Sequence, residues 1–339
     1  MNAAQERMTT KPPTARSVAP LIRRFPALAS VPHVSLGHYP TPVEPADALA
    51  RGLWIKREDR AAEPMGGNKV RALEFLLGDI RRGDHVVTVG ALGSTHALAT
   101  AIFARRLGAK VSVWRWPQEM SAGAATVAAR IAAEVDGASA SSSVVGAYIR
   151  AGAARMGGAR WVPAGGSSPL GVLGHVNAAL ELAEQIDAGL VPRPRRIVVP
   201  LGTGGTAAGL ALGARLGGID AEILAVRVVP RVVANHRRVM RLARGTARLI
   251  ERLTGAPIPQ LDDSSVRIVH AFYGGAYGRT TAAASAAAVR CLQATTIAVD
   301  VTYSAKALAA SLADAAPVSG TTLFWLTFDG RLLRVAGSG

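Results

Sequence analysis

The segment GGNKVRALEFLL, residues 66–77, places a lysine where a helix is expected to begin. Gly66 and Gly67 permit a close approach of the backbone to a ligand, and Lys69 falls in the first turn of the amphipathic stretch that follows. The partial positive charge of a helix N-terminus disfavours an ammonium ion, so we expect a lowered pKa for Lys69. Such an amine suits attack on a carbonyl. The tetrapeptide alone is equally compatible with a solvent-facing lysine after a turn.

A second glycine-rich turn follows the apolar run RRIVVPL and precedes the helix-like stretch AAGLALGARLG. Backbone N–H groups at the start of such a helix bind phosphate, and threonine hydroxyls add further donors. The predicted phosphate-binding residues are Gly202, Thr203, Gly204, Gly205 and Thr206.

The same turn also fits the dinucleotide pattern G-x-G-x-x-A through Gly202, Gly204 and Ala207. A nicotinamide site would need an acidic residue at the far end of the next strand, to bind a ribose. The acidic residues Asp220 and Glu222 stand at the beginning of that strand instead. We therefore expect a phosphate cup, and keep an NAD(P)-dependent oxidoreductase as an alternative.

A third turn, GALGSTH at residues 90–96, also joins a predicted strand to a predicted helix. Ser94, Thr95 and His96 bring hydroxyls, amides and an imidazole to a helix start, where a substrate carboxylate could bind. An ordinary N-cap with a packed histidine explains the same residues. The sequence has no H-E-x-x-H spacing and no G-x-S-x-G pattern, so we expect neither a metal site nor a serine hydrolase.

Short apolar or β-branched runs alternate with amphipathic stretches along the chain. The predicted strands are 85–90, 110–114, 195–202, 221–229, 266–270, 297–301 and 321–327. The predicted helices include 69–82, 171–186 and the alanine-rich stretch 281–289. This alternation predicts a doubly wound, mostly parallel α/β fold.

The composition excludes several classes of protein. Of the 339 residues, 49% are hydrophobic and 18% are charged, which excludes a disordered or collagen-like chain. The net charge is +16, and one helical stripe of bases consists of Arg237, Arg241, Arg244, Arg248 and Arg252. We expect a solvated face there and no nucleic-acid partner, because no aromatic residues are interleaved. A non-catalytic module that binds anions or a protein partner would use this stripe.

The compartment follows from the single cysteine, Cys291, which permits no internal disulfide and indicates the cytoplasm. No apolar run reaches the roughly 18 to 20 residues that span a bilayer, so no membrane association is expected. Residues 1–24 are interpreted as a flexible N-terminal tail without the apolar core of a signal peptide.

A phosphate cup, a lysine suited to a Schiff base and an α/β frame together indicate pyridoxal 5′-phosphate (PLP) as the cofactor. The sequence resembles the fold-type II PLP enzymes of the tryptophan synthase β-like superfamily, in the branch of D-cysteine desulfhydrase and 1-aminocyclopropane-1-carboxylate deaminase. The segments that carry the resemblance are LGHYPTPVEPADAL (36–49), LWIKRED (53–59), GGNKVRALEFLL (66–77) and GGSSPLGVLGHVNAALEL (165–182).

The resemblance implies a role for individual residues. Lys69 would form the covalent linkage to the cofactor, with Asn68 beside it, and residues 202–206 would hold the phosphate. Ser94 would contact the substrate carboxylate and assist proton transfer, with Thr95 and His96 nearby. The active-site tyrosines, Tyr277 and Tyr303, and Ser304, which would meet the pyridine nitrogen, complete the implied set.

Ser304 bears on the reaction, because the family's deaminases carry a glutamate there and its desulfhydrase-like members a threonine. A hydroxyl leaves the ring nitrogen closer to neutral than a carboxylate does, and opening a cyclopropane ring demands more of the cofactor. We therefore expect β-elimination from a small amino acid to a 2-oxo acid and ammonia. Ring opening, or a divergent reaction on another amino acid, is the alternative.

Some positions depart from the family pattern. Thr95 replaces an asparagine that touches the cofactor, Val301 replaces a proline, and LTFDG (326–330) replaces H-T-G-G, which introduces Phe328 and Asp329. These changes could redirect the pocket to another amino acid or mark a lost activity.

The expected domain organisation also follows the family. A small α/β domain of residues 83–178 would be inserted into a large cofactor-binding domain made of 25–82 and 179–339. The resemblance further implies a homodimer.

Overall fold

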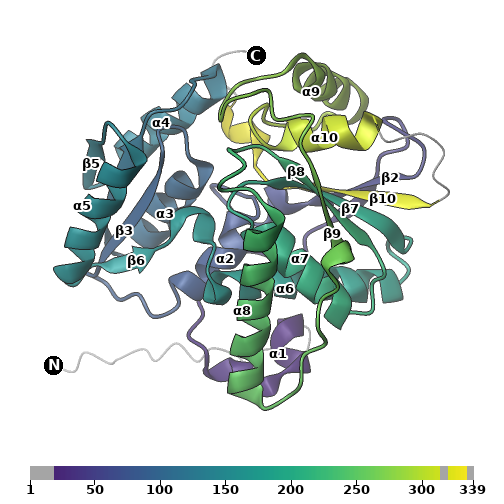
Figure 1. The fold of residues 1–339 in the computed structure, drawn as a ribbon, viewed down its shortest axis with the longest axis horizontal. Coiled ribbons are helices and arrows are strands. Elements are labelled where there is room, and N and C mark those ends of the chain that lie inside the picture. The colour runs from purple at the N-terminus through teal and green to yellow at the C-terminus, as the bar shows by residue number, and fades with distance from the viewer. Residues whose placement is uncertain (1–18, 314–319, 334–339) are drawn as a thin grey trace, which may run out of the picture.

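The computed structural model describes residues 19–313 and 320–333, and within them the predicted α/β architecture is present as two sheets (Figure 1). Every neighbouring pair in the six-stranded sheet is parallel except β1 with β2. In spatial order its strands are β1 (Val43–Pro45), β2 (Leu53–Arg57), β10 (Thr321–Leu326), β7 (Pro194–Leu201), β8 (Glu222–Arg227) and β9 (Val266–Val269).

Helices cover both faces of this larger sheet, which explains the unbroken apolar run in β7. Ile197 and Val199 belong to the core on the side of α6 (Pro169–Asp187), α7 (Gly205–Leu216) and α8 (His236–Thr254). Val198 points to the opposite core, against α9 (Ala282–Thr295) and α10 (Ser304–Ala313). Successive strand residues thus serve two separate cores.

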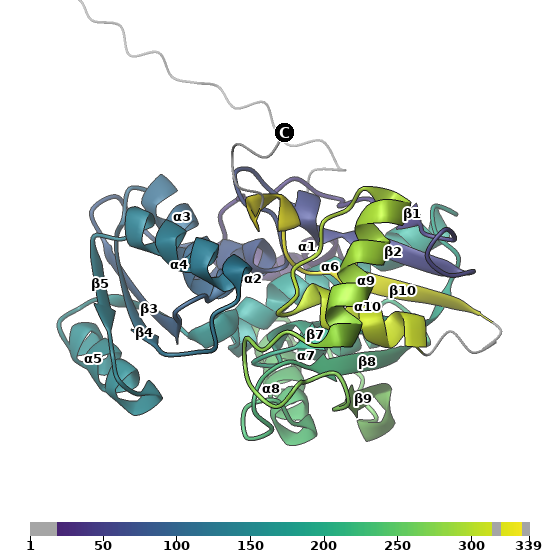
Figure 2. The same ribbon diagram turned by 90° about the horizontal axis from the view of Figure 1, so that it is seen from above.

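The smaller sheet is wholly parallel and stands beside the larger one (Figure 2). Its strands, in spatial order, are β5 (Gly137–Ala140), β4 (Lys110–Trp116), β3 (His85–Ala91) and β6 (Arg160–Val162). One face packs on α3 (Thr95–Arg106) and α4 (Ala122–Glu134), in a core that also takes up α2 (Lys69–Leu76). The other face packs on α5 (Val144–Met156).

Six predicted strands are confirmed, but the expected strand at 297–301 is wrong. This segment runs as irregular chain into α10, because the side chain of Asp300 turns back on the backbone that follows. Its carboxylate accepts hydrogen bonds from the N–H groups of Tyr303 at 2.7 Å and Ser304 at 3.0 Å. The short strands β1, β2, β5 and β6 were not predicted.

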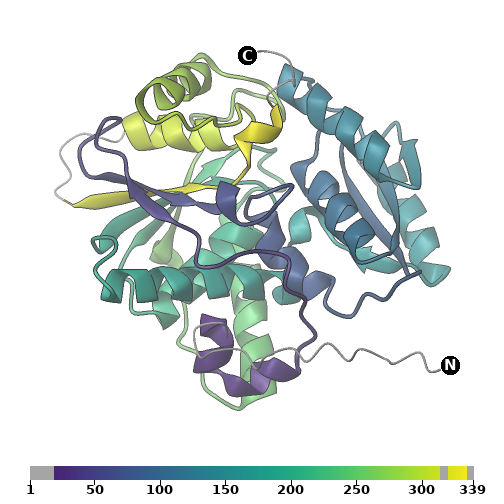
Figure 3. The same cartoon turned by 180° about the vertical axis from the view of Figure 1, so that it is seen from behind.

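Two expected boundaries also differ from the structure. Part of the expected tail, Pro20–Arg24, is the helix α1, in which Leu21 is fully buried and its N–H donates to Asn177 Oδ1 at 3.0 Å; residues 1–18 lie outside the described residues. Figure 3 shows the segment of α1 in purple at the lower end of the molecule, where α1 contacts α6. The expected boundary at residue 178 falls inside the continuous helix α6, so we propose that the smaller unit ends before Pro169. Within the described residues, no helix is long and apolar enough to cross a membrane.

Candidate active site

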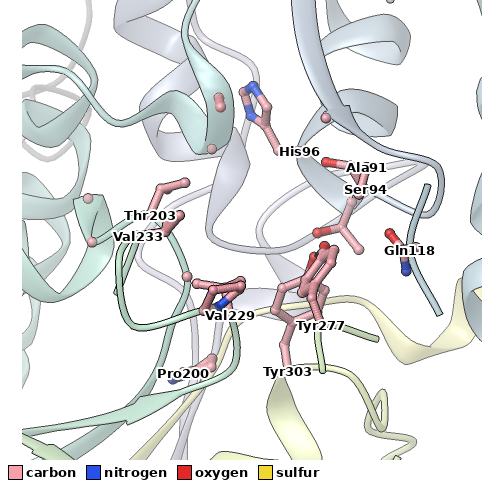
Figure 4. Close-up of a pocket in the computed structure, with 18 of the residues that line it drawn as sticks. Ala91, Ser94, His96, Gln118, Pro200, Thr203, Val229, Val233, Tyr277 and Tyr303 are labelled. Atoms are coloured by element: carbon pink, nitrogen blue, oxygen red, sulfur yellow. Dashed lines mark hydrogen bonds between the residues drawn. The ribbon is translucent and has the colours of Figure 1, made fainter. Parts of the chain in front are cut away.

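A cavity of about 520 Å³ lies between the two sheets and is lined by residues from both (Figure 4). The carboxyl ends of β3, β4 and β7 and the segment that follows β8 line it, which is where open α/β sheets bind ligands. Figure 4 shows Tyr277, Tyr303 and Ser94 together, facing Thr203 and Val229 across the space. The site therefore combines segments that are far apart in the sequence.

The two glycines before Lys69 are required by backbone packing. A Cβ atom at Gly66 would lie 1.8 Å from the carbonyl oxygen of Asp59. Gly67 has a φ of +115°, and a Cβ there would lie 2.7 Å from the carbonyl oxygen of Thr327. The backbone at these glycines approaches other parts of the protein's own chain. The sequence instead predicts an approach to a ligand. They fix the position at which α2 begins.

Lys69 is the first residue of α2 and lines the cavity, as predicted. Its Nζ lies 3.4 Å from the carbonyl oxygen of Gly165. Burial lowers the pKa of Lys69 to about 8. At pH 7 about a tenth of this amine is therefore unprotonated and nucleophilic, far more than for an ordinary lysine.

Asn68 links the lysine segment to the glycine-rich turn. Its Nδ2 donates to Thr206 Oγ1 at 2.7 Å, although the two residues lie in different parts of the chain. Both side chains are buried, and both residues line the cavity. This bond fixes the lysine relative to the predicted phosphate-binding turn.

The turn at residues 202–206 has the backbone that a phosphate site needs. It follows β7 and leads into α7, and Gly204 is the N-cap with a φ of +96°, where a side chain would be strained. A Cβ at Gly202 would meet nothing within 4 Å, so open space adjoins the backbone there. The turn is braced by Ser167, whose Oγ accepts from Gly205 N at 3.2 Å and lies 2.6 Å from Thr203 Oγ1.

Ser94 proves to be both an N-cap and a cavity residue. Its Oγ accepts from the N–H of Ala97 at 3.3 Å, while the residue lines the cavity with Thr95 and His96. The cap leaves the hydroxyl hydrogen of Ser94 free to donate to a ligand. His96 Nε2 lies 3.1 Å from Thr88 Oγ1, and burial, with Lys69 nearby, lowers the pKa of His96 to about 3. This histidine is therefore neutral at physiological pH.

The two predicted tyrosines meet in the cavity. The hydroxyls of Tyr277 and Tyr303 are in direct contact, and their rings lie edge to face with centroids 6.0 Å apart. Burial raises the pKa of Tyr277 to about 12, and burial also raises the pKa of Tyr303 well above its ordinary value. Both phenols stay protonated and can donate a proton or a hydrogen bond.

Ser304 is the one predicted site residue that does not line the cavity. It is fully buried, and its Oγ lies 3.4 Å from Thr327 Oγ1. Thr327 does line the cavity and was not predicted. The predicted contact of Ser304 with the pyridine nitrogen stays a prediction.

The LTFDG departure has a structural account. Phe328 lines the cavity and pairs with Gly67 in an isolated antiparallel bridge. Asp329 is buried, and its Oδ2 accepts from Arg331 at 2.6 Å. The charged residue is thus neutralised inside the protein by its own neighbour.

Sequence reasoning missed other cavity residues besides Thr327. Arg238 enters from the start of α8, while Trp116 and Tyr148 form an aromatic wall with ring centroids 6.2 Å apart. Ser167 stood in the quoted segment GGSSP, which could have indicated a bracing hydroxyl. Arg238 gave no signal, because it lies off the arginine stripe.

The residues present fit PLP. An amine with a lowered pKa, a glycine turn with open space at Gly202 and the N-terminus of the twelve-residue helix α7 border one cavity. Lys69 would hold the aldehyde carbon, and the turn at 202–206 would hold the phosphate.

Comparisons with known proteins agree with this chemistry. The family described as "Pyridoxal-phosphate dependent enzyme" matches residues 34–327. The chain is 36% identical to Nocardicin C-9' epimerase of Nocardia uniformis subsp. tsuyamanensis, over 88% of this chain and 93% of that one. It is 31% identical to a D-cysteine desulfhydrase of Klebsiella pneumoniae, over 83% of this chain and 88% of that one.

A solved structure described as an ACC deaminase homologue superposes with a TM-score of 0.76 at 26% identity, over 92% of this chain and 95% of that one. The predicted fold-type II class is thereby confirmed. Because the family match extends from residue 34 to residue 327, the chain belongs to the pyridoxal-phosphate dependent enzymes, and PLP is its cofactor.

Proposed function

We propose that this enzyme catalyses β-elimination from a small amino acid, giving a 2-oxo acid and ammonia. The observation that carries the proposal is the meeting of Lys69, Ser94 and the Tyr277–Tyr303 pair in one cavity with the turn at 202–206. The identity to D-cysteine desulfhydrases supports the reaction class.

Each group has a task that its environment suits. PLP, when bound, supplies an electron sink for the pair left by the broken Cα–H bond. Lys69, once the substrate amine has taken its place on the cofactor, would be a free amine with a pKa of about 8 and could accept that proton near neutral pH. Ser94 can donate its hydroxyl hydrogen to the substrate carboxylate, and the protonated tyrosines can deliver a proton to the departing β-substituent. Loss of the α-proton and the β-substituent leaves an unsaturated amine. Reaction with one water molecule then gives a 2-oxo acid and ammonia.

The family resemblance assigns the position at the pyridine nitrogen to Ser304, which is buried against the cavity residue Thr327, and a hydroxyl there would favour elimination over opening of a cyclopropane ring. A hydroxyl stabilises a protonated ring nitrogen less than a carboxylate does. Ring opening would be favoured if 1-aminocyclopropane-1-carboxylate gave ammonia faster than amino acids with a β-leaving group.

A second candidate is inversion at the α-carbon of an amino acid with a larger side chain. The identity to Nocardicin C-9' epimerase supports it, and so does the aromatic wall of Trp116 and Tyr148 at the cavity. Inversion needs no leaving group, so the two candidates differ in their products.

One experiment separates them. Purified enzyme with PLP is incubated in D₂O with D- and L-amino acids, some carrying a β-leaving group, and 2-oxo acid, ammonia and α-deuterium are measured. The proposal expects 2-oxo acid and ammonia in equal amounts from at least one substrate. Deuterium exchange with loss of chirality and without ammonia would favour the second candidate. If no substrate gave either result, both candidates would be contradicted.

The tyrosines give a sharper test of the elimination. Tyr277→Phe and Tyr303→Phe should each lower kcat about 100-fold, since general acid catalysis contributes on the order of 10²–10⁴. Tyr273→Phe is the matched control, because Tyr273 is buried outside the cavity lining. Unchanged kcat in both site variants would remove the tyrosines from the mechanism.

Quaternary structure and location are also proposals. The resemblance to the fold-type II enzymes supports a homodimer, and the single buried cysteine supports the cytoplasm. Sedimentation of the purified protein tests the homodimer, and a monomer at all concentrations would contradict it.

Fractionation of source cells tests the cytoplasmic location, and recovery of the protein outside the cytoplasmic fraction would contradict it.

A further inference from the structure

The arginine-rich helix α8 has two different sides. Arg237, Arg241, Arg244, Arg248 and Arg252 are all exposed, and Arg244 forms an ion pair with Asp263 at 2.8 Å. Arg238 lies off this stripe and is the arginine of α8 that lines the cavity. The solvated face and the cavity residue are therefore separate features of one helix.

Arg238 is bonded to the turn that the cofactor's phosphate would occupy. Its Nε donates to the carbonyl oxygen of Thr203 at 2.9 Å. The first turns of α8 also pack on that turn, since a Cβ at Gly204 would lie 3.4 Å from Val239 and 3.5 Å from Leu242. The geometry of Thr203 and Gly204 thus depends on α8.

The charge on Arg238 stands in an unfavourable place for the protein alone. It is the third residue of α8, where the partial positive charge of the helix start repels a cation. Asn235 caps this helix by accepting from Arg238 N at 2.9 Å, so the helix start is already satisfied. Among residues 19–313 and 320–333, no carboxylate forms an ion pair with Arg238. An anion in the cavity would relieve this imbalance.

We propose that Arg238 is a positioning residue for the cofactor phosphate: it holds the Thr203 carbonyl in place and adds positive charge beside the turn at 202–206. This inference rests on the proposed PLP site and extends it to a helix whose arginine stripe faces solvent. Arginine suits the task because its guanidinium keeps several donors in a fixed plane.

The test compares PLP with pyridoxal, which has the same aldehyde and ring but no phosphate. Both are titrated into cofactor-free enzyme in a phosphate-free buffer, and binding is followed by absorbance. In Arg238→Ala, the Kd for PLP should rise about tenfold, while the Kd for pyridoxal changes less than about twofold. Arg238→Lys keeps the charge but loses the bond from Nε to Thr203, so its Kd for PLP should lie between the values of wild type and Arg238→Ala.

Arg237→Ala is the matched control, because it removes the same charge from the exposed face of the same turn. It should leave both dissociation constants within about twofold of wild type. Inorganic phosphate should also compete less well with PLP in Arg238→Ala than in wild type.

The outcomes are distinguishable from a failure of the proposed function. If the wild-type enzyme binds neither PLP nor pyridoxal, the cofactor site itself is wrong. If Arg238→Ala weakens PLP and pyridoxal equally, Arg238 merely maintains the fold and the inference is overturned. If Arg238→Ala leaves the Kd for PLP unchanged but raises the KM for the amino acid, the inference is also overturned. Arg238 would then contact the substrate and not the cofactor phosphate.

Discussion

Lys56 and Lys69 stand thirteen positions apart, and the protein treats their amines in opposite ways. Lys56 is fully buried in a network: its Nζ donates to Glu181 at 2.6 Å, to Gln185 at 2.6 Å and to the carbonyl oxygen of Thr41 at 2.8 Å. Arg71 shares the same carboxylate, at 2.9 Å from Glu181 Oε2. Every proton of the Lys56 ammonium thus has an acceptor.

Lys69 has one acceptor, the Gly165 carbonyl oxygen at 3.4 Å, and no ion pair with any carboxylate of the described residues. Burial lowers the pKa of both lysines, but at Lys56 the charge of Glu181 opposes the shift. The buried cation of Lys56 is thus fully paired, whereas Lys69, the amine to which we assign the chemistry, is left without a counter-charge.

Removing the amine of Lys69 should have the largest effect. Lys69→Ala should lose the covalent linkage to PLP and lower the rate of elimination by about 10³-fold or more, because no other lysine of the described residues lines the cavity. The spectrum of the reconstituted variant and its turnover with the best substrate check this. Elimination at the wild-type rate would contradict the assignment of the chemistry to Lys69.

Breaking the network around Lys56 should affect stability instead. Glu181→Ala leaves Lys56 and Arg71 without their shared carboxylate, so the free energy of unfolding should fall by about 3–5 kcal/mol. Glu184→Ala, on the same helix, removes only an exposed pair with Arg23 and should cost about 0–1 kcal/mol. Denaturant unfolding of both variants measures the difference, and equal losses would show that the network is not special.

The pH dependence of cofactor attachment should report the pKa of Lys69. Because burial lowers this pKa to about 8, the neutral amine increases roughly fivefold from pH 7 to pH 8 and less than twofold above pH 8. The rate of attachment should follow the same curve in stopped-flow absorbance. An ordinary lysine would instead give a rate that still climbs through pH 10.

The smallest effect is expected at Gln185. Gln185→Ala removes one of three acceptors from Lys56 but keeps Glu181, so the free energy of unfolding should fall by about 1–2 kcal/mol. PLP binding should not change, since Gln185 does not line the cavity. A loss as large as that of Glu181→Ala would show that the charge of Glu181 contributes little.

Most of the fold and the central part of the site could be predicted from the sequence, because their signals are local. β7 and the turn at 202–206 are contiguous, and so are Asn68 and Lys69. The position of Tyr277 and Tyr303 came from the family resemblance, and the structure brings their hydroxyls together.

What could not be predicted depends on contacts between distant segments. Arg238 and Thr327 reach the cavity only because α8 and the end of β10 are folded against the turns there. The wrong strand at 297–301 has a similar cause, since Asp300 bonds to Tyr303 and Ser304 in place of a neighbouring strand. The sequence pattern alone cannot reveal which backbone N–H groups will donate to a buried carboxylate.

The most direct test of the central claim is to reduce the PLP-loaded enzyme with borohydride and to map the labelled peptide by mass spectrometry. We predict a visible absorbance that disappears on reduction and one cofactor adduct, on Lys69. An adduct on Lys56, or on the buried Lys306 whose pKa is also lowered to about 8, would contradict the account. So would a protein that stays colourless after PLP is added.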